Sequence, residues 1–143
     1  MSNQFQDCLK RGKIKKFSRG RTLSTKELGL AREDLAYAKD SFKKKNYRWS
    51  IVQTYYSMFH SARSLLFKEN YREHSHFCLI EAIRELYIKA GRLELSLLES
   101  LIKAKQLRES ADYYGEFSDL NAKKLIIDAE KFIEKVKEII NRK

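Results

Sequence analysis

Residues 55–67, YYSMFHSARSLLF, are the most apolar and most aromatic run in this chain of 143 residues. From Trp49 to Leu66, apolar side chains recur three or four residues apart, and others widen this stripe around the helix. A helix that is apolar on most sides is typical of the centre of a bundle. His60 and Arg63 interrupt the run. Because buried polar groups need partners, we expect these two residues to face a polar helix or a cleft.

The rest of the chain predicts further amphipathic helices with short connections. Proline is absent and glycine occurs five times, which favours long helices. The first helix is predicted to begin near Ser24, which has the spacing of a capping box with Glu27. The predicted helices cover residues 24–45, 47–68, 76–90, 94–113 and 119–140. We therefore predict an all-α fold, an antiparallel up-and-down bundle of four to five helices over residues 24–143.

Residues 1–23 lack helical periodicity and are strongly basic. Seven basic residues stand there against the single acid Asp7, so this segment carries +6 of the formal net charge of +11. Such a segment cannot bury a core of its own, and we predict a flexible tail. Two interpretations stay open: the tail grips phosphates without sequence preference, or it serves solubility alone.

Cysteine usage and hydropathy bear on the compartment. Cys8 and Cys78 do not make a disulfide framework, which indicates a reducing environment. The N-terminus has no apolar signal region, and no window reaches the ~18 apolar residues that a membrane span needs. We predict a cytoplasmic protein.

Several motifs carry a family resemblance. They are LAREDL at 30–35, YYSMFHSARSLL at 55–66, His76, KAGRL at 89–93 and RESADY at 108–113. Together they resemble the HEPN superfamily, in particular its small stand-alone prokaryotic, UPF0332-like members, over residues 25–142. The resemblance implies a helical bundle that is commonly a homodimer. It also implies binding of nucleotide or RNA, toxins that are metal-independent ribonucleases, and a small nucleotidyltransferase partner that serves as antitoxin.

The resemblance also implies an active-site motif, an arginine followed four to six residues later by a histidine. RNA carries its own nucleophile, the 2′-hydroxyl, so such a site needs a proton-transfer group and a cation rather than a metal. Arg108 stands at the arginine position, but Asp112, Tyr113 and Tyr114 occupy the positions four to six residues beyond it. Arg108 and Asp112 also have the spacing of a local ion pair on one helix face.

Other residues are candidates for the missing histidine. His60 lies on the central helix, where it either approaches Arg108 or is a satisfied core residue. His76 opens the third predicted helix, either as a ligand-binding residue or as a cap. Tyr113 is a candidate proton donor or stacking group, because a pKa near ~10 makes it a poor base.

Three hypotheses follow for function. The one we favour is a module that binds nucleotide or RNA, and a nucleotidyltransferase, through a polar cleft. The second is a ribonuclease toxin that uses Arg108 with a displaced base, and the third is a structural bundle. The predicted cleft comprises His60, Arg63, Arg108, Asp112 and Tyr113, with His76 as a further ligand-binding candidate. We predict no cofactor and no zinc site, because the H-x-H-x-C run at 74–78 lacks a fourth ligand.

Overall fold

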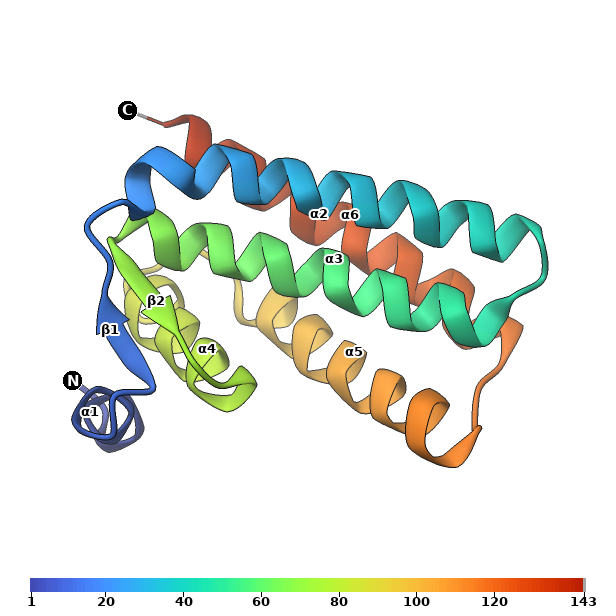
Figure 1. Ribbon diagram of the computed structural model, residues 1–143, viewed down its shortest axis with the longest axis horizontal. Helices are drawn as coiled ribbons and strands as arrows, with labels where there is room; N and C mark the ends of the chain where they lie inside the picture. Colours follow the sequence, from blue (N-terminus) through green and yellow to red (C-terminus); the bar gives the residue numbers. More distant parts are fainter. Residues whose placement is uncertain (143) are drawn as a thin grey trace.

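The computed structural model describes residues 1–142 and confirms an all-α bundle. Its long helices, α2 (Gly20–Lys43), α3 (Tyr47–Lys68), α5 (Leu95–Tyr114) and α6 (Asp119–Asn141), run alternately up and down (Figure 1). The shorter elements gather at one end: α1 (Asn3–Lys10), β1 (Ile14–Lys16), β2 (Tyr71–Glu73), α4 (His76–Ile83) and the π-helical turn η1 (Arg84–Ile88). No helix within the described residues is long and apolar enough to cross a membrane.

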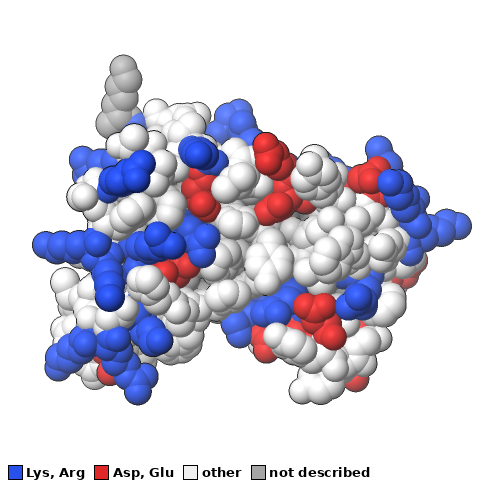
Figure 2. Space-filling view, in the orientation of Figure 1, with Lys and Arg blue, Asp and Glu red and all other residues white. Residues whose placement is uncertain are grey.

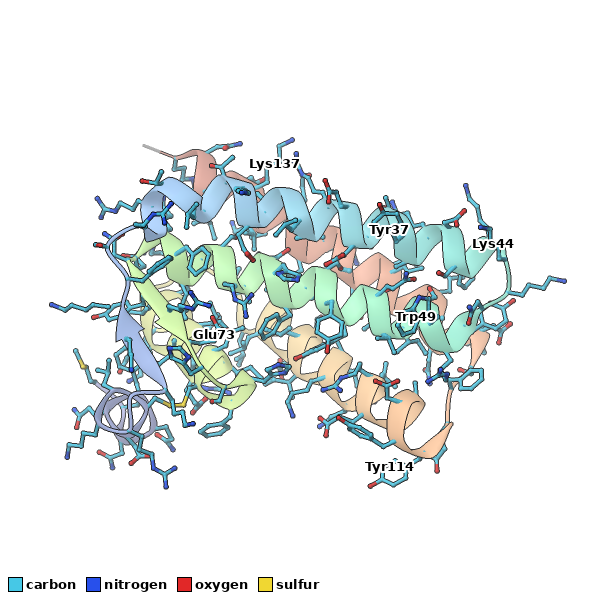
Figure 3. The ribbon with its side chains drawn as sticks, in the orientation of Figure 1. Tyr37, Lys44, Trp49, Glu73, Tyr114 and Lys137 are labelled. Atoms are coloured by element: carbon cyan, nitrogen blue, oxygen red, sulfur yellow. A yellow bond between two sulfur atoms is a disulfide. The ribbon has the colours of Figure 1, made fainter. Side chains whose placement is uncertain are left out.

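Helix α3 is central, as its apolar character predicts. It packs against α2, α5, α6 and α4, and residues such as Met58 and Leu65 are fully buried. Two aromatic residues of the predicted core stripe differ from the prediction. Trp49 is 45% exposed and Tyr56 is 37% exposed, because they lie on the face that no neighbouring helix covers. Figure 3 shows Trp49 on the open side of α3, near Tyr37 of α2.

A column of buried hydroxyl groups lets α3 approach its neighbours closely. The column consists of Ser50, Thr54, Ser57, Ser61 and Ser64, all fully buried. Ser50 donates to the carbonyl oxygen of Ala38 on α2 at 2.8 Å. The others donate to carbonyl oxygens three or four residues earlier in α3, so the column leaves no hydroxyl donor unpaired.

The N-terminal segment is folded onto the bundle, which corrects the prediction of a flexible tail for residues 1–23. Phe5, Cys8 and Ile14 are buried, and β1 pairs antiparallel with β2. A disulfide joins Cys8 to Cys78, so the expectation that these two cysteines form no disulfide was wrong. The packing of this segment on the bundle could not be predicted from the sequence, and the reason is physical. An eight-residue helix shows barely two turns of periodicity, and its partners come from residues 71–78, far along the chain.

The start of α2 also differs from the prediction. The helix begins at Gly20, and Ser24 donates its hydroxyl to the carbonyl oxygen of Arg21 instead of capping a helix. Gly20 lies against the end of α3, where a Cβ atom would be 2.3 Å from the carbonyl oxygen of Phe67. The capping box with Glu27 is therefore absent, and a close backbone contact fixes this helix end instead. By contrast, the start of α6 has a side-chain cap, because the Ser118 hydroxyl oxygen accepts from the Asn121 amide at 3.1 Å.

Candidate functional site

The centre of the candidate site is Arg108 on α5, whose side chain is almost fully buried. Its guanidinium carbon lies 5.2 Å from the ring centroid of Tyr55 and 5.6 Å from that of Tyr113. Nη1 of Arg108 donates to the Tyr113 hydroxyl at 3.2 Å. Its Nε is buried and has no hydrogen-bond partner among residues 1–142. Two aromatic rings therefore hold a cation that makes one hydrogen bond with its five N–H donors within residues 1–142.

The charge of Arg108 is secure. Burial acts to lower its pKa, but the hydrogen bond to Tyr113 and the other nearby tyrosines raise the pKa above its ordinary value. The guanidinium stays charged at any physiological pH.

His76, at the first position of α4, joins this group through Tyr55. The Tyr55 hydroxyl and His76 Nδ1 are 2.5 Å apart, and the His76 ring lies 4.5 Å from the Phe59 ring. Burial, together with the positive charge of Arg108, lowers the pKa of His76, so its ring is neutral near pH 7. Burial also raises the pKa of Tyr55 well above its ordinary value, so the phenol keeps its proton.

Asp112 is shared between two arginines. Its carboxylate lies 3.1 Å from Nη1 of Arg48 on α3 and 3.9 Å from Nη1 of Arg108. The predicted pair between Arg108 and Asp112 is therefore the longer of the two contacts. Because Arg48 makes the shorter one, Asp112 neutralises Arg108 only in part.

His60 lies in a different environment from the one that an approach to Arg108 requires. It faces α2, where its Nδ1 is 2.9 Å from Glu27 and its Nε2 is 3.5 Å from Asp34. This matches the alternative of a satisfied histidine. Each ring nitrogen of His60 faces a carboxylate of α2, so neither nitrogen is turned toward Arg108.

Arg63 belongs to the same second cluster. It makes a two-point contact with Glu73 of β2, at 2.7 Å and 3.1 Å, and its guanidinium lies 4.6 Å from the Phe59 ring centroid. Such a fork is a strong and directional pair. The predicted cleft therefore divides into a group around Arg108 and a carboxylate-bound group around His60 and Arg63, with Phe59 between them.

The sequence model of the HEPN domain matches residues 28–139. The chain belongs to the HEPN family. The protein named "Putative toxin MJ0605" of Methanocaldococcus jannaschii is 30% identical over 112 residues, which are 78% of this chain and 84% of that protein. A UPF0332 protein of Archaeoglobus fulgidus is 34% identical over 73% of this chain and 85% of its own length. UPF0332 protein glr0978 of Gloeobacter violaceus is 33% identical over 59% of this chain and 70% of its own length.

In this HEPN domain, sequence reasoning missed two residues of the group around Arg108. Tyr55 is buried, as its place in the apolar run predicts, but its hydroxyl also lies within hydrogen-bond distance of His76. A buried tyrosine needs a partner for its hydroxyl, and that requirement is the signal that points to it. Arg48 stands seven residues before Tyr55, two turns along the same face of α3, which is also a detectable spacing.

The cysteine of the H-x-H-x-C run at residues 74–78 is not a free thiol. Cys78 is in a disulfide and therefore offers no thiolate to a metal. Within residues 1–142, no group of three or more His, Cys, Asp or Glu side chains is placed to hold a metal ion.

Proposed function

We propose that this HEPN protein binds RNA at the group formed by Arg108, Tyr55, His76 and Tyr113, as the toxin-like member of a toxin–antitoxin-type pair. The observation that carries the proposal is the guanidinium of Arg108, held between two tyrosine rings with only one of its N–H donors in a hydrogen bond within residues 1–142. A fixed guanidinium recognises phosphate, because its donors match the phosphate oxygens. Tyr113 is 67% exposed and offers a ring on which an unpaired base can stack.

The distribution of charge also supports RNA as the ligand. Figure 2 shows that lysine and arginine gather at the end of the molecule that carries α1 and β1. Four exposed lysines contribute there, Lys10, Lys13, Lys15 and Lys16. Because α1 and β1 are fixed to the bundle, these charges form a surface that can hold a phosphate backbone without sequence preference.

The position of His76 favours a second function, metal-independent cleavage of the bound RNA. His76 would donate Nδ1–H to the Tyr55 hydroxyl and take the 2′-hydroxyl proton at Nε2. The 2′-oxygen then bonds to phosphorus, the bond from phosphorus to the 5′-oxygen breaks, and Tyr113 protonates that oxygen. Arg108 stabilises the charge of the phosphorane. The products are a 2′,3′-cyclic phosphate and a 5′-hydroxyl.

Partners form part of the proposal. A relative is named as a toxin, and the HEPN resemblance implies a small nucleotidyltransferase as its antitoxin. We also expect a homodimer. Apolar side chains are exposed at the turn between α5 and α6, directly after Asp112, and Tyr114 among them is 75% exposed and points away from the bundle (Figure 3). Light scattering measures the mass, and co-purification with a nucleotidyltransferase from the neighbouring gene tests the partner.

RNA binding and cleavage are tested together with three variants. Fluorescence polarisation measures binding of single-stranded RNA, and gels measure cleavage, both in EDTA to exclude metal-dependent nucleases. Arg108→Gln is expected to weaken binding at least tenfold, because a charged hydrogen bond to phosphate is lost. His76→Gln is expected to keep binding and lose cleavage. His60→Gln is the matched control and is expected to keep both.

The outcomes separate the two functions. Unchanged RNA affinity in Arg108→Gln would remove the group around Arg108 as the binding site. Binding without cleavage in the unaltered protein leaves the binding function in place and eliminates the ribonuclease. Cleavage that survives in His76→Gln but is lost in His60→Gln would assign the base to the second cluster instead.

A further inference from the structure

A basic cavity lies at the end of the bundle remote from Arg108. It has a volume of about 640 Å³, is open to solvent, and is lined by the start of α2, the end of α3, residue Arg92 and the end of α6. Four cationic side chains line it, Arg21, Lys68, Arg92 and Arg142, against one carboxylate, Glu69. The volume lies within the usual range for small-molecule sites.

Within residues 1–142, two of these cations have backbone carbonyl oxygens, and no carboxylate, as partners. Nε of Arg21 donates to the carbonyl oxygen of Lys68 at 3.1 Å, and Nζ of Lys68 donates to the carbonyl oxygen of Arg142 at 3.2 Å. Neither cation contacts a carboxylate within residues 1–142. Glu69 is already paired with Arg92 at 2.7 Å. The cavity therefore collects more positive charge than its own acid can balance.

The geometry of the lining favours a bound anion. Cations brought together repel one another, and an anion between them removes that repulsion. Arg92 is held in place by Glu69 and by the Tyr87 ring, 4.5 Å from its guanidinium carbon, so it offers a fixed fork of donors. Thr25 adds an exposed hydroxyl, and Ile139 and Ile140 give one wall an apolar surface. A single phosphate would fill a small part of this volume.

We infer that this cavity binds an oligophosphate, a ligand with two or more linked phosphates. The site is separate from the group around Arg108, because Tyr55 and Lys68 lie thirteen residues apart on α3, about 20 Å along the helix axis. The inference goes beyond the proposed function and does not depend on it. Two kinds of ligand carry linked phosphates: an inorganic oligophosphate, and a nucleotide with its phosphate chain.

Isothermal titration calorimetry measures the affinity of the full-length protein for inorganic tripolyphosphate and for ATP, and this tests the inference. Arg21→Gln and Lys68→Gln are each expected to weaken tripolyphosphate binding about tenfold, since each removes a charge-assisted contact. Arg21→Lys keeps the charge and is expected to retain most of the affinity. Arg32→Gln removes an exposed cation of α2 that is outside the cavity, and it is expected to change nothing. Thermal melts confirm that each variant is folded.

Each outcome decides the matter. Equal affinities for tripolyphosphate and ATP support recognition of the phosphates alone, and tighter ATP binding supports a nucleotide. No binding of either ligand overturns the inference, as does an equal loss in Arg32→Gln, which would indicate general charge attraction. Loss in Arg108→Gln with full binding in Arg21→Gln would place the anion at the group around Arg108. Failure of RNA binding there, with oligophosphate binding intact, would count against the proposed function alone.

Discussion

At the scale of single residues, Arg108 is held in place by the side chains around it. The rings of Tyr55 and Tyr113 hold its guanidinium, and Asp112 is drawn partly away by Arg48. A side chain that is already ordered loses little conformational entropy on binding, so more of its hydrogen-bond energy contributes to affinity. The same two rings restrict the movement of the Arg108 side chain, so its positive charge stays in one position.

The titration of His76 is expected to make the stability of the protein depend on pH. Its pKa in the folded protein is lowered by burial and by Arg108, below the unfolded value of 6.5. The unfolded chain therefore takes up this proton first as the pH falls. Stability linked to His76 is full above pH 6.5, is lost as the pH falls through the window below 6.5, and levels off beneath the folded pKa.

Urea denaturation at about pH 7.5 and about pH 5 measures this effect, since the two values bracket an ordinary histidine pKa. The unaltered protein is expected to lose more free energy of unfolding on acidification than His76→Gln, in which this position cannot titrate. The other two histidines are present in both proteins, so the difference isolates His76. Equal losses would contradict the assignment.

Substitution of glycine by alanine is expected to have opposite effects on stability at two positions of α2. Gly20→Ala places a Cβ atom 2.3 Å from the carbonyl oxygen of Phe67, so α2 and α3 must separate. We expect a loss of about 1–3 kcal/mol in the free energy of unfolding, as for other overpacked sites. Gly29→Ala is the matched control. Nothing lies within 4 Å of its added Cβ, so we expect a gain of about 0.5–1 kcal/mol from helix propensity. Chemical denaturation measures both, and a stabilising Gly20→Ala would disprove the close contact.

At the scale of elements, α1 depends on α4 and on the strand pair. An isolated eight-residue helix is unstable in water, so α1 needs the contacts that Phe5 and Cys8 make with residues of the bundle. Phe5 meets Tyr71 of β2 edge to face, at a centroid distance of 6.2 Å. The same strand supplies Glu73 to Arg63, so the N-terminal segment and the second cluster share one element.

The disulfide predicts a large redox effect on stability. It closes a loop with a sequence separation of 70 residues, for which the loss of chain entropy in the unfolded state corresponds to about 4 kcal/mol. Reduction of the unaltered protein is expected to lower the free energy of unfolding by about that amount. The double variant Cys8→Ala/Cys78→Ala should be insensitive to reductant. If reduction leaves the unaltered protein equally stable, the disulfide does not staple α1 to α4 in solution.

At the scale of the whole molecule, the charge of +11 is unevenly placed, with +6 in the first 23 residues. Because α1 and β1 carry core residues and one half of the disulfide, deletion of the segment would disturb the fold as well as the charge. Neutralisation is the sharper experiment. Lys10, Lys13, Lys15 and Lys16 are exposed, so replacing them with glutamine leaves the packing intact.

In this four-lysine variant, RNA binding is expected to depend less steeply on salt concentration. Each phosphate contact on single-stranded nucleic acid contributes about 0.7 to the slope of log affinity against log salt, so the slope should become shallower by up to about 3. The control replaces Lys43, Lys44 and Lys45, at the opposite end of α2, with glutamine. An unchanged slope in the four-lysine variant would show that the basic surface does not hold RNA.

The sequence alone was sufficient for the main helices and for Arg108 as a candidate. The bounds of α3 match the prediction, and α5 and α6 differ by a residue or so, because helical periodicity, Gly115 and the Ser118 cap are local properties. The start of α2 was missed by four residues, because its true boundary depends on contacts with the end of α3. A helix boundary set by another helix has no local sequence pattern.

Which polar residues meet depends on how the helices pack. His60 and His76 are indistinguishable as candidates from the residue type, but packing turns His60 toward the carboxylates of α2 and places His76 on Tyr55 beside Arg108. It also paired Cys8 with Cys78 and drew β1 onto β2, contacts between residues at least 55 positions apart. The four long helices, the basic charge of the N-terminal segment and the family resemblance could be predicted from the sequence, since these depend on neighbouring residues. The composition of the site depends on contacts between distant residues, which exist only once the helices have packed.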